Sequence, residues 1–180
     1  MSTKKTTHKS TPKQNLDGTT SNELLTTDNK VNEVSDQAAE VESPFVSLLI
    51  GNALKLSDKS SGQLGYELSL NTEDNCRYLR LTSNDSGGLF SKEWVKLDDV
   101  FTLLESMQVD EPFKSSVFKA VVKGGSANNV SFFSAVLRSQ EIALIIKSEK
   151  SQFLHLVNPI LSKRIEHLSK LKPLTETSEN

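Results

Sequence analysis

The sequence predicts an α+β fold of antiparallel sheets packed on helices, built from two repeats and preceded by a disordered tail. Two observations support this prediction. Segments in which apolar and polar residues alternate are followed by a segment of helical spacing, and this order occurs twice. All eleven aromatic residues lie between Phe45 and Phe153, so the preceding part of the chain lacks the apolar surface that a core requires.

The composition divides the chain into regions. Residues 1–43 are rich in Ser, Thr, Asn and Gln, basic at first and then mostly acidic, and are predicted to be a disordered tail that acts either as an electrostatic arm or as a solubilising segment. Residues 44–175 are predicted to form a single α+β domain of two repeats, 44–109 and 113–172. Residues 173–180 are predicted to be a disordered C-terminus.

The first repeat is predicted to contain four strands and a helix. Glycine interrupts the first strand at Gly51 and suggests a bulge there, and polar turns separate the strands that follow. Asp98 is placed to cap the helix. The predicted elements are a strand at 45–50 continuing at 53–56, strands at 65–70, 77–82 and 92–97, and a helix at 99–107.

The second repeat is predicted to contain three strands and a long helix. The strand-like runs are separated by Gly- and Asn-rich or Ser-containing gaps that suit hairpins. The helix has a wide apolar stripe, and Pro159 is expected to kink or divide it. The predicted elements are strands at 116–123, 130–138 and 141–147 and a helix at 151–171.

Charge and cysteine content exclude several classes of protein. Lys and Arg number 21 against 23 Asp and Glu, a net charge of −2, which argues against a nucleic-acid binder that works by bulk positive charge alone. Positive groups would have to gather on one face. A single Cys excludes a disulfide scaffold, a thiolate zinc cluster and a CxxC redox pair. With no signal-peptide core and no apolar run of membrane-spanning length, a soluble, cytoplasmic protein is predicted.

An enzyme is not expected. The sequence contains no Walker, GxSxG or HExxH motif. His8, His155 and His167 form no close metal-ligand pair, and His155 is interpreted as a helix-surface or packing residue. We therefore expect no catalytic residue, cofactor, metal or small-molecule substrate.

Two neighbouring strands of the first repeat carry the most informative residues. Because side chains two apart share a face of a strand, Leu79 and Leu81 point to the core and their neighbours point outward. Aromatic rings stack on unpaired bases, and interleaved cations neutralise phosphates. The candidate nucleic-acid-binding residues on this face are Tyr78, Arg80, Lys92, Trp94 and Lys96. The alternative is that Trp94 is partly buried under a loop and the lysines only keep a sheet surface soluble.

The second repeat offers a weaker set with the same chemistry. The outward-facing candidates there are Lys119, Lys123, Phe132 and Arg138. Valine and isoleucine side chains would share this face, so an interface between subunits or repeats is an equal alternative.

The first repeat resembles the PUR repeat of the Pur-alpha family, most clearly over residues 64–107. There an aromatic-x-Leu strand, a polar turn and the basic-aromatic-Leu-basic-aliphatic run at 77–81 precede a Gly-containing loop, a strand and a helix. The resemblance implies two repeats intertwined in one domain, a fold similar to those of positive-cofactor-type coactivators and Whirly proteins. It also implies binding of single-stranded DNA or RNA on the sheet surface. The second repeat lacks the basic-aromatic run.

Three hypotheses are consistent with the sequence. The first is a single-stranded nucleic-acid-binding protein, a DNA-binding transcriptional regulator. The second is a protein-interaction or dimerisation scaffold without nucleic-acid binding. The third is a duplex-DNA regulator that uses a β-ribbon. The wide apolar stripe predicted for the C-terminal helix suggests a homodimer.

Overall fold

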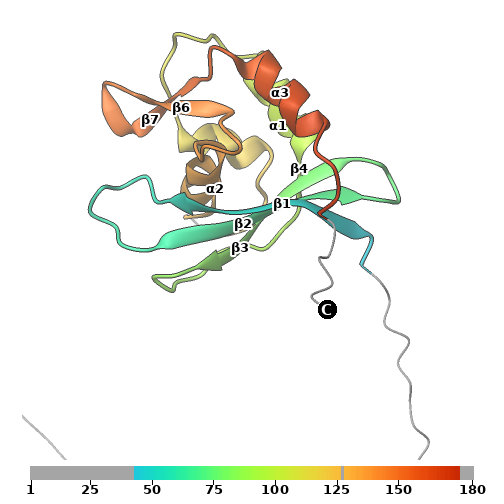
Figure 1. Cartoon of the computed structure of the whole chain (residues 1–180). Coiled ribbons are helices and arrows are strands. Elements are labelled where there is room, and N and C mark those ends of the chain that lie inside the picture. The colour runs from blue at the N-terminus through green and yellow to red at the C-terminus, as the bar shows by residue number, and fades with distance from the viewer. Residues whose placement is uncertain (1–42, 127, 175–180) are drawn as a thin grey trace, which may run out of the picture. The chain divides into compact units, whose positions relative to one another are not determined.

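A computed structural model describes residues 43–126 and 128–174, which form an α+β fold of two antiparallel sheets and several helices (Figure 1). The fold class predicted from the sequence is therefore confirmed at this level. The predicted tail lies outside the described residues except for Ser43, and so does the predicted C-terminus beyond residue 174. No helix in the described ranges has the length and apolar character needed to cross a membrane.

The first sheet follows the prediction closely. Its strands pair in the order β1-β2-β3-β4, each antiparallel to its neighbour. The predicted bulge is displaced: β1 runs unbroken through Gly51, and the register shifts between Ser47 and Leu49 instead. The last strand is shorter than predicted. The strands are β1 (Phe45–Leu54), β2 (Gln63–Asn71), β3 (Arg77–Asn84) and β4 (Val95–Lys96).

Helix α1 (Leu97–Glu105) starts two residues before the predicted helix. Asp98 and Asp99 lie in its first turn, where carboxylates interact favourably with the helix dipole. Asp98 is not the cap, because the N-cap residue is Lys96 and it makes no side-chain capping bond. The predicted apolar side is buried at Val100, Phe101 and Leu104.

The second half differs from the predicted three strands and a helix. The predicted strand at 116–123 is wrong, because most of it is a 3₁₀ helix, and the predicted strand at 130–138 is wrong, because it is an α-helix. The predicted helix at 151–171 is also wrong, because its first part is a strand. The elements are β5 (Phe113–Lys114), η1 (Ser115–Ala120), α2 (Asn129–Leu137), β6 (Ile145–Ser148), β7 (Ser151–Val157) and α3 (Leu161–Ser169).

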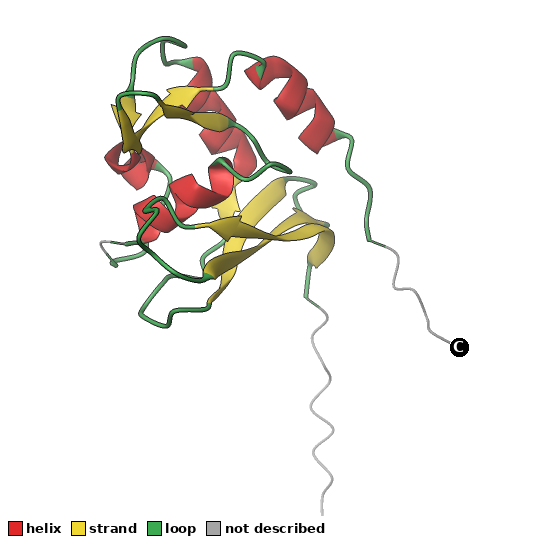
Figure 2. Ribbon diagram, turned by 60° about the vertical axis from the view of Figure 1, so that its left-hand side comes forward, coloured by secondary structure: helices red, strands yellow, loops and turns green. Residues whose placement is uncertain are grey.

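The three short strands of the second half form a sheet in the order β5-β7-β6. Figures 1 and 2 show α2 between the two sheets. On one side α2 contacts β1 and β2, and α1 contacts β3 and β4, so both helices cover the same face of the first sheet. That face supplies buried apolar side chains, among them Leu64, Leu68, Leu79 and Val95. The opposite face of the first sheet is left for other contacts.

Gly51 is required by its neighbour across the sheet, Tyr66. The two residues pair in register, and a Cβ atom on Gly51 would lie 2.5 Å from Tyr66 Oη. The hydroxyl is held in place: it donates to Glu141 Oε2 at 3.0 Å and accepts from Ser139 Oγ at 3.1 Å. Burial raises the pKa of Tyr66 to about 12, so the hydroxyl keeps its proton.

Replacing Gly51 with alanine is expected to lower the free energy of unfolding by about 1–3 kcal/mol, because Tyr66 must leave its partners to make room. Urea denaturation measures the loss. Gly125→Ala is the matched control, since a Cβ there meets nothing within 4 Å, and it should change stability by less than about 0.5 kcal/mol. Equal stability of the two variants would contradict the placement of Tyr66.

Candidate nucleic-acid interface

Tyr78, Arg80, Trp94 and Lys96 come together on the outward face of the first sheet. Tyr78 on β3 pairs with Lys96 on β4, and the Arg80 guanidinium carbon lies 4.2 Å from the centroid of the indole ring of Trp94. Phe45, at the start of β1, was not predicted here. Its ring stacks on Trp94 with centroids 4.1 Å apart and meets the edge of Tyr78 at 5.5 Å.

Arg80 is neutralised within the chain. Its Nε and Nη2 atoms donate to Glu67 Oε2 at 2.9 and 2.7 Å. The other carboxylate oxygen, Oε1, accepts from Ser47 at 2.5 Å and from Ser69 at 2.8 Å. Burial alone would raise the pKa of Glu67, which is 8% exposed, but the hydrogen bonds from Ser47, Arg80 and Ser69 outweigh it and lower that pKa.

Trp94 is half-buried under side chains of the same sheet. A phenyl ring and a guanidinium group, both about 4 Å from one indole, would collide on the same side. We infer that Phe45 and Arg80 occupy its two faces. A base could stack on Trp94 only by displacing one of them, so this cluster is better suited to holding the sheet together than to receiving nucleic acid.

The remaining side chains at this edge are less constrained. Tyr78 Oη donates to Asp74 Oδ2 at 2.6 Å, and this hydrogen bond raises the pKa of Tyr78. A contact with Cys76 raises the pKa of Lys96, which stays charged at neutral pH. Lys92 lies in the loop before β4, with its ammonium 5.9 Å from the centroid of the Phe90 ring. Lys123 is near this loop, because its backbone nitrogen donates to Glu93 Oε2 at 3.0 Å.

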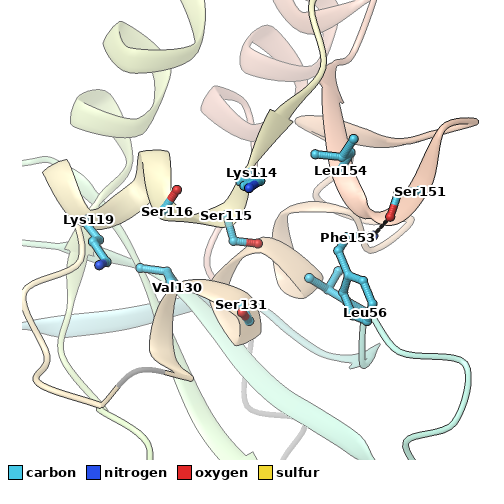
Figure 3. A pocket seen from close by; sticks show the side chains of 10 residues that line it. All are labelled: Leu56, Lys114, Ser115, Ser116, Lys119, Val130, Ser131, Ser151, Phe153 and Leu154. Atoms are coloured by element: carbon cyan, nitrogen blue, oxygen red, sulfur yellow. Dashed lines mark hydrogen bonds between the residues drawn. The ribbon is translucent and has the colours of Figure 1, made fainter.

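The other predicted residues lie elsewhere, at a groove between the β1–β2 hairpin and the second half. Two pockets of about 540 and 430 Å³ adjoin at Leu56, and we call them together the cationic groove. Figure 3 shows the larger one. The basic side chains that line the groove are Lys55, Lys114, Lys119, Arg138 and Lys147, and the carboxylates are Asp58 and Glu141.

The cationic groove brings together three predicted residues from η1 and α2. Lys119 and Arg138 line it, and the ammonium group of Lys55 lies 5.8 Å from the centroid of the Phe132 ring. Arg138 is committed to the fold: Nη1 and Nη2 donate to the carbonyls of Gln152 and Leu154 at 2.8 and 2.5 Å. Burial lowers the pKa of Arg138.

The lysines of the cationic groove differ from Arg80 and Arg138. Within residues 43–126 and 128–174 the ion pairs are Arg80–Glu67 and Lys170–Glu166. The groove lysines at 55, 114, 119 and 147 therefore have no carboxylate partner in that part of the chain. Lys55 does contact the hydroxyl of Ser86. Lys92 and Lys96 at the sheet face also lack a carboxylate partner among the described residues, so the groove differs in bringing together four such lysines rather than two.

His155 lies beneath the larger pocket. Of the two interpretations, a helix-surface residue and a packing residue, the first is wrong: His155 is a fully buried residue of the strand β7, with 0% exposure. Its Nε2 atom is 2.8 Å from Ser115 Oγ, and Nδ1 has no hydrogen-bond partner among the described residues. Burial, with a smaller contribution from the charge of Arg138, lowers the pKa of His155 to about 4. The imidazole is therefore neutral at neutral pH.

Several groove residues could not be found from the sequence. Lys55 and Leu56 follow β1, and Phe153 was assigned to the apolar side of a helix, whereas it is a strand residue with 52% of its surface exposed. Even the correct secondary structure would not have predicted this exposure, because Phe153 shares a face of β7 with the buried His155 and Val157. In the described ranges no group of three His, Cys, Asp or Glu side chains is arranged to hold a metal ion.

The fold and this geometry define an α+β domain with a cationic groove. Comparison with known protein families, with curated proteins and with solved structures found no match to the chain.

Proposed function

We propose that this chain is a single-stranded nucleic-acid-binding protein, acting as a DNA-binding regulator of transcription. The observation that carries the proposal is the cationic groove, which is lined by five basic side chains and two carboxylates. Residues 44–180 as a whole have equal numbers of basic and acidic residues, so the groove concentrates charge of the sign that phosphates require.

Aromatic surface beside the charge supports a single strand over a duplex. Phe153 is 52% exposed and lines the larger pocket. Unpaired bases stack on such rings, whereas the bases of a duplex are already stacked on each other. The resemblance to the PUR repeat over residues 64–107 adds an independent reason for this class. In that family the sheet surface binds, whereas here the groove is the better interface, because Trp94 and Arg80 have partners in the chain.

The test is a titration of a dye-labelled oligothymidylate with the protein, followed by fluorescence anisotropy at several salt concentrations. The affinity is expected to fall steeply as salt rises. Lys119→Ala combined with Lys147→Ala should weaken binding about tenfold and make the salt dependence shallower, because each lost phosphate contact lowers the slope by about 0.7 for a single strand.

The matched control removes two lysines outside the groove, Lys163 and Lys172, both exposed. This variant should bind as tightly as the wild type. No change in anisotropy at low salt would refute the proposal. A duplex that binds more tightly than the single strand would favour the β-ribbon alternative. If the oligonucleotide quenches the fluorescence of Trp94 equally in the wild type and in the groove variants, the interface is on the sheet face instead.

The scaffold alternative has lost part of its basis. The apolar stripe that suggested dimerisation was assigned to one helix at 151–171, but its residues are divided between β7 and α3. Leu161 and Leu168 of α3 are buried within the same chain. The homodimer stays a prediction, and light scattering across a range of protein concentrations measures it.

A further inference from the structure

The larger pocket of the cationic groove has two kinds of surface. Figure 3 shows Phe153 and Leu56 on one side and Lys119 and Val130 on the other, with the hydroxyl groups of Ser115 and Ser131 between them. No carboxylate lines this pocket, whereas Asp58 and Glu141 line the neighbouring one. The volume of about 540 Å³ is within the range of small-molecule sites. A ligand with an anionic group and a flat ring would match both surfaces.

The hydroxyl of Ser115, which lines this pocket, is available to donate a hydrogen bond into it. A neutral imidazole carries one hydrogen, and on Nδ1 of His155 it would be a buried N–H without an acceptor among the described residues. The hydrogen is therefore on Nε2, which donates to Ser115 Oγ, 2.8 Å away.

The tautomer fixes what Ser115 can do. Because its oxygen accepts from His155, its own hydrogen is directed elsewhere, and Ser115 lines the pocket. The hydroxyl can therefore donate to an anionic oxygen there. With this tautomer His155 cannot act as a general base for Ser115, because a nitrogen that donates a hydrogen bond to a hydroxyl does not accept the proton of that hydroxyl.

We propose that this pocket binds one nucleotide unit, with its phosphate on Lys119 and the Ser115 hydroxyl and its base on the ring of Phe153. The inference rests on the proposed function and deepens it, since it names the pocket in which one nucleotide of a strand is bound. The unit is either a free mononucleotide or one residue of a longer strand, and the two sources have the same phosphate and base.

The experiment uses the full chain and four probes, observed by NMR chemical shifts and by calorimetry. The probes are deoxyadenosine monophosphate, inorganic phosphate, deoxyadenosine and an oligodeoxyadenylate. The mononucleotide is expected to shift the signals of Ser115, Lys119 and Phe153. It should bind about tenfold more tightly than phosphate or deoxyadenosine alone, because only the nucleotide reaches both surfaces. The oligonucleotide should shift the same signals at lower concentration.

Two variants separate the two surfaces. Phe153→Ala, a change at an exposed side chain, should weaken the mononucleotide about tenfold and leave phosphate unchanged. Ser115→Ala should weaken both the mononucleotide and phosphate. Because Ser115→Ala also removes the partner of His155, Lys119→Ala serves as a second variant of the phosphate side. Ser162→Ala, an exposed serine of α3, is the control and should bind every probe like the wild type.

The outcomes keep the two proposals apart. If the oligonucleotide binds but neither the mononucleotide nor the oligonucleotide shifts the pocket signals, the pocket inference is wrong and the proposed function stands. If the oligonucleotide fails to bind at low salt, the proposed function is wrong, and the inference falls with it unless the mononucleotide still binds here as a free ligand. A mononucleotide bound equally by Phe153→Ala and the wild type would overturn the inference alone.

Discussion

Replacing Glu67 with alanine is expected to lower the free energy of unfolding by about 2–3 kcal/mol, because it leaves buried partners without an acceptor. Ser69 is 0% exposed, and its hydroxyl and that of Ser47 both donate to Glu67. Arg80 would lose two charge-assisted hydrogen bonds. Its side chain is 35% exposed and can turn partly to water, which limits the loss. Chemical denaturation of both proteins measures the difference.

The control is the other ion pair of the described residues. Lys170 and Glu166 lie one turn apart with side chains 73% and 63% exposed. Glu166→Ala should cost no more than about 0.5 kcal/mol, since water replaces the lost partner. A loss at Glu67 as small as the loss at Glu166 would mean that the network on the sheet face does not exist.

The Glu67 network also predicts a pH dependence. The folded-state pKa of Glu67 is lower than the ordinary value of 4.5. A lowered folded pKa gives stability that is complete above the unfolded pKa and is lost as the pH falls through the folded one. Wild-type stability should therefore decline below about pH 4.5, and Glu67→Gln should lose this part of the decline. Identical pH profiles would contradict the assignment.

The network changes how Arg80 should be tested. From the sequence, Arg80 is a candidate phosphate ligand, and a loss of binding in Arg80→Ala would be read as a lost contact. In the structure Arg80 bridges Glu67 and Trp94, so the same variant should lose stability first. Binding by this variant is informative only beside its unfolding curve, whereas Lys119 makes no such internal contact.

The first half of the fold could be predicted because its signals are local. Each strand alternates apolar and polar residues, and each turn has its own chemistry. In the turn after β2, for example, Asn71 and Asp74 side chains accept from the backbone nitrogens of Glu73 and Cys76. Asn75 takes a positive φ of 55°, which asparagine tolerates better than most residues. No contact with the second half is needed to specify these hairpins.

The secondary structure predicted for the second half was wrong because the residue types in its segments and the spacing of their buried residues indicate different elements. Residues 116–123 contain β-branched and aromatic residues typical of strands. The buried residues there, Phe118 and Val122, and Ser115 just before them are three and four residues apart, which is a helical spacing. Residues 151–157 show the reverse: His155 and Val157, two residues apart, are buried while Leu156 between them is not, as in a strand. Short segments of this kind are decided by tertiary packing rather than by propensity.

The groove could not be predicted for the same reason. Lys119 and Arg138 were expected to share a face as neighbours on two strands, and they share the cationic groove as residues of η1 and of the end of α2. Lys55 reaches the groove from the β1–β2 hairpin. The wall of the groove therefore depends on contacts between segments far apart in the sequence, and periodicity within one segment does not reveal such contacts.

Replacing Phe118 with alanine is expected to lower the free energy of unfolding by about 3–5 kcal/mol, the typical cost of a large cavity in a core. The ring is 0% exposed and meets Phe113 and Phe133 edge-on, with centroids 6.0 and 5.9 Å away. Phe153→Ala is the control of the same chemistry, and it should cost less than about 1 kcal/mol because Phe153 is exposed. Urea denaturation compares the two.

A second substitution separates the 3₁₀ helix from the strand predicted there. In a strand that buries Phe118 and Val122, the residue between them, Ala120, would face the core as well. In η1, Ala120 is exposed. Ala120→Asp should therefore leave stability within about 0.5 kcal/mol of the wild type, since a charge that stays in water costs little. An unfolded Ala120→Asp protein would mean that this segment is a strand and that the groove beside it has a different wall.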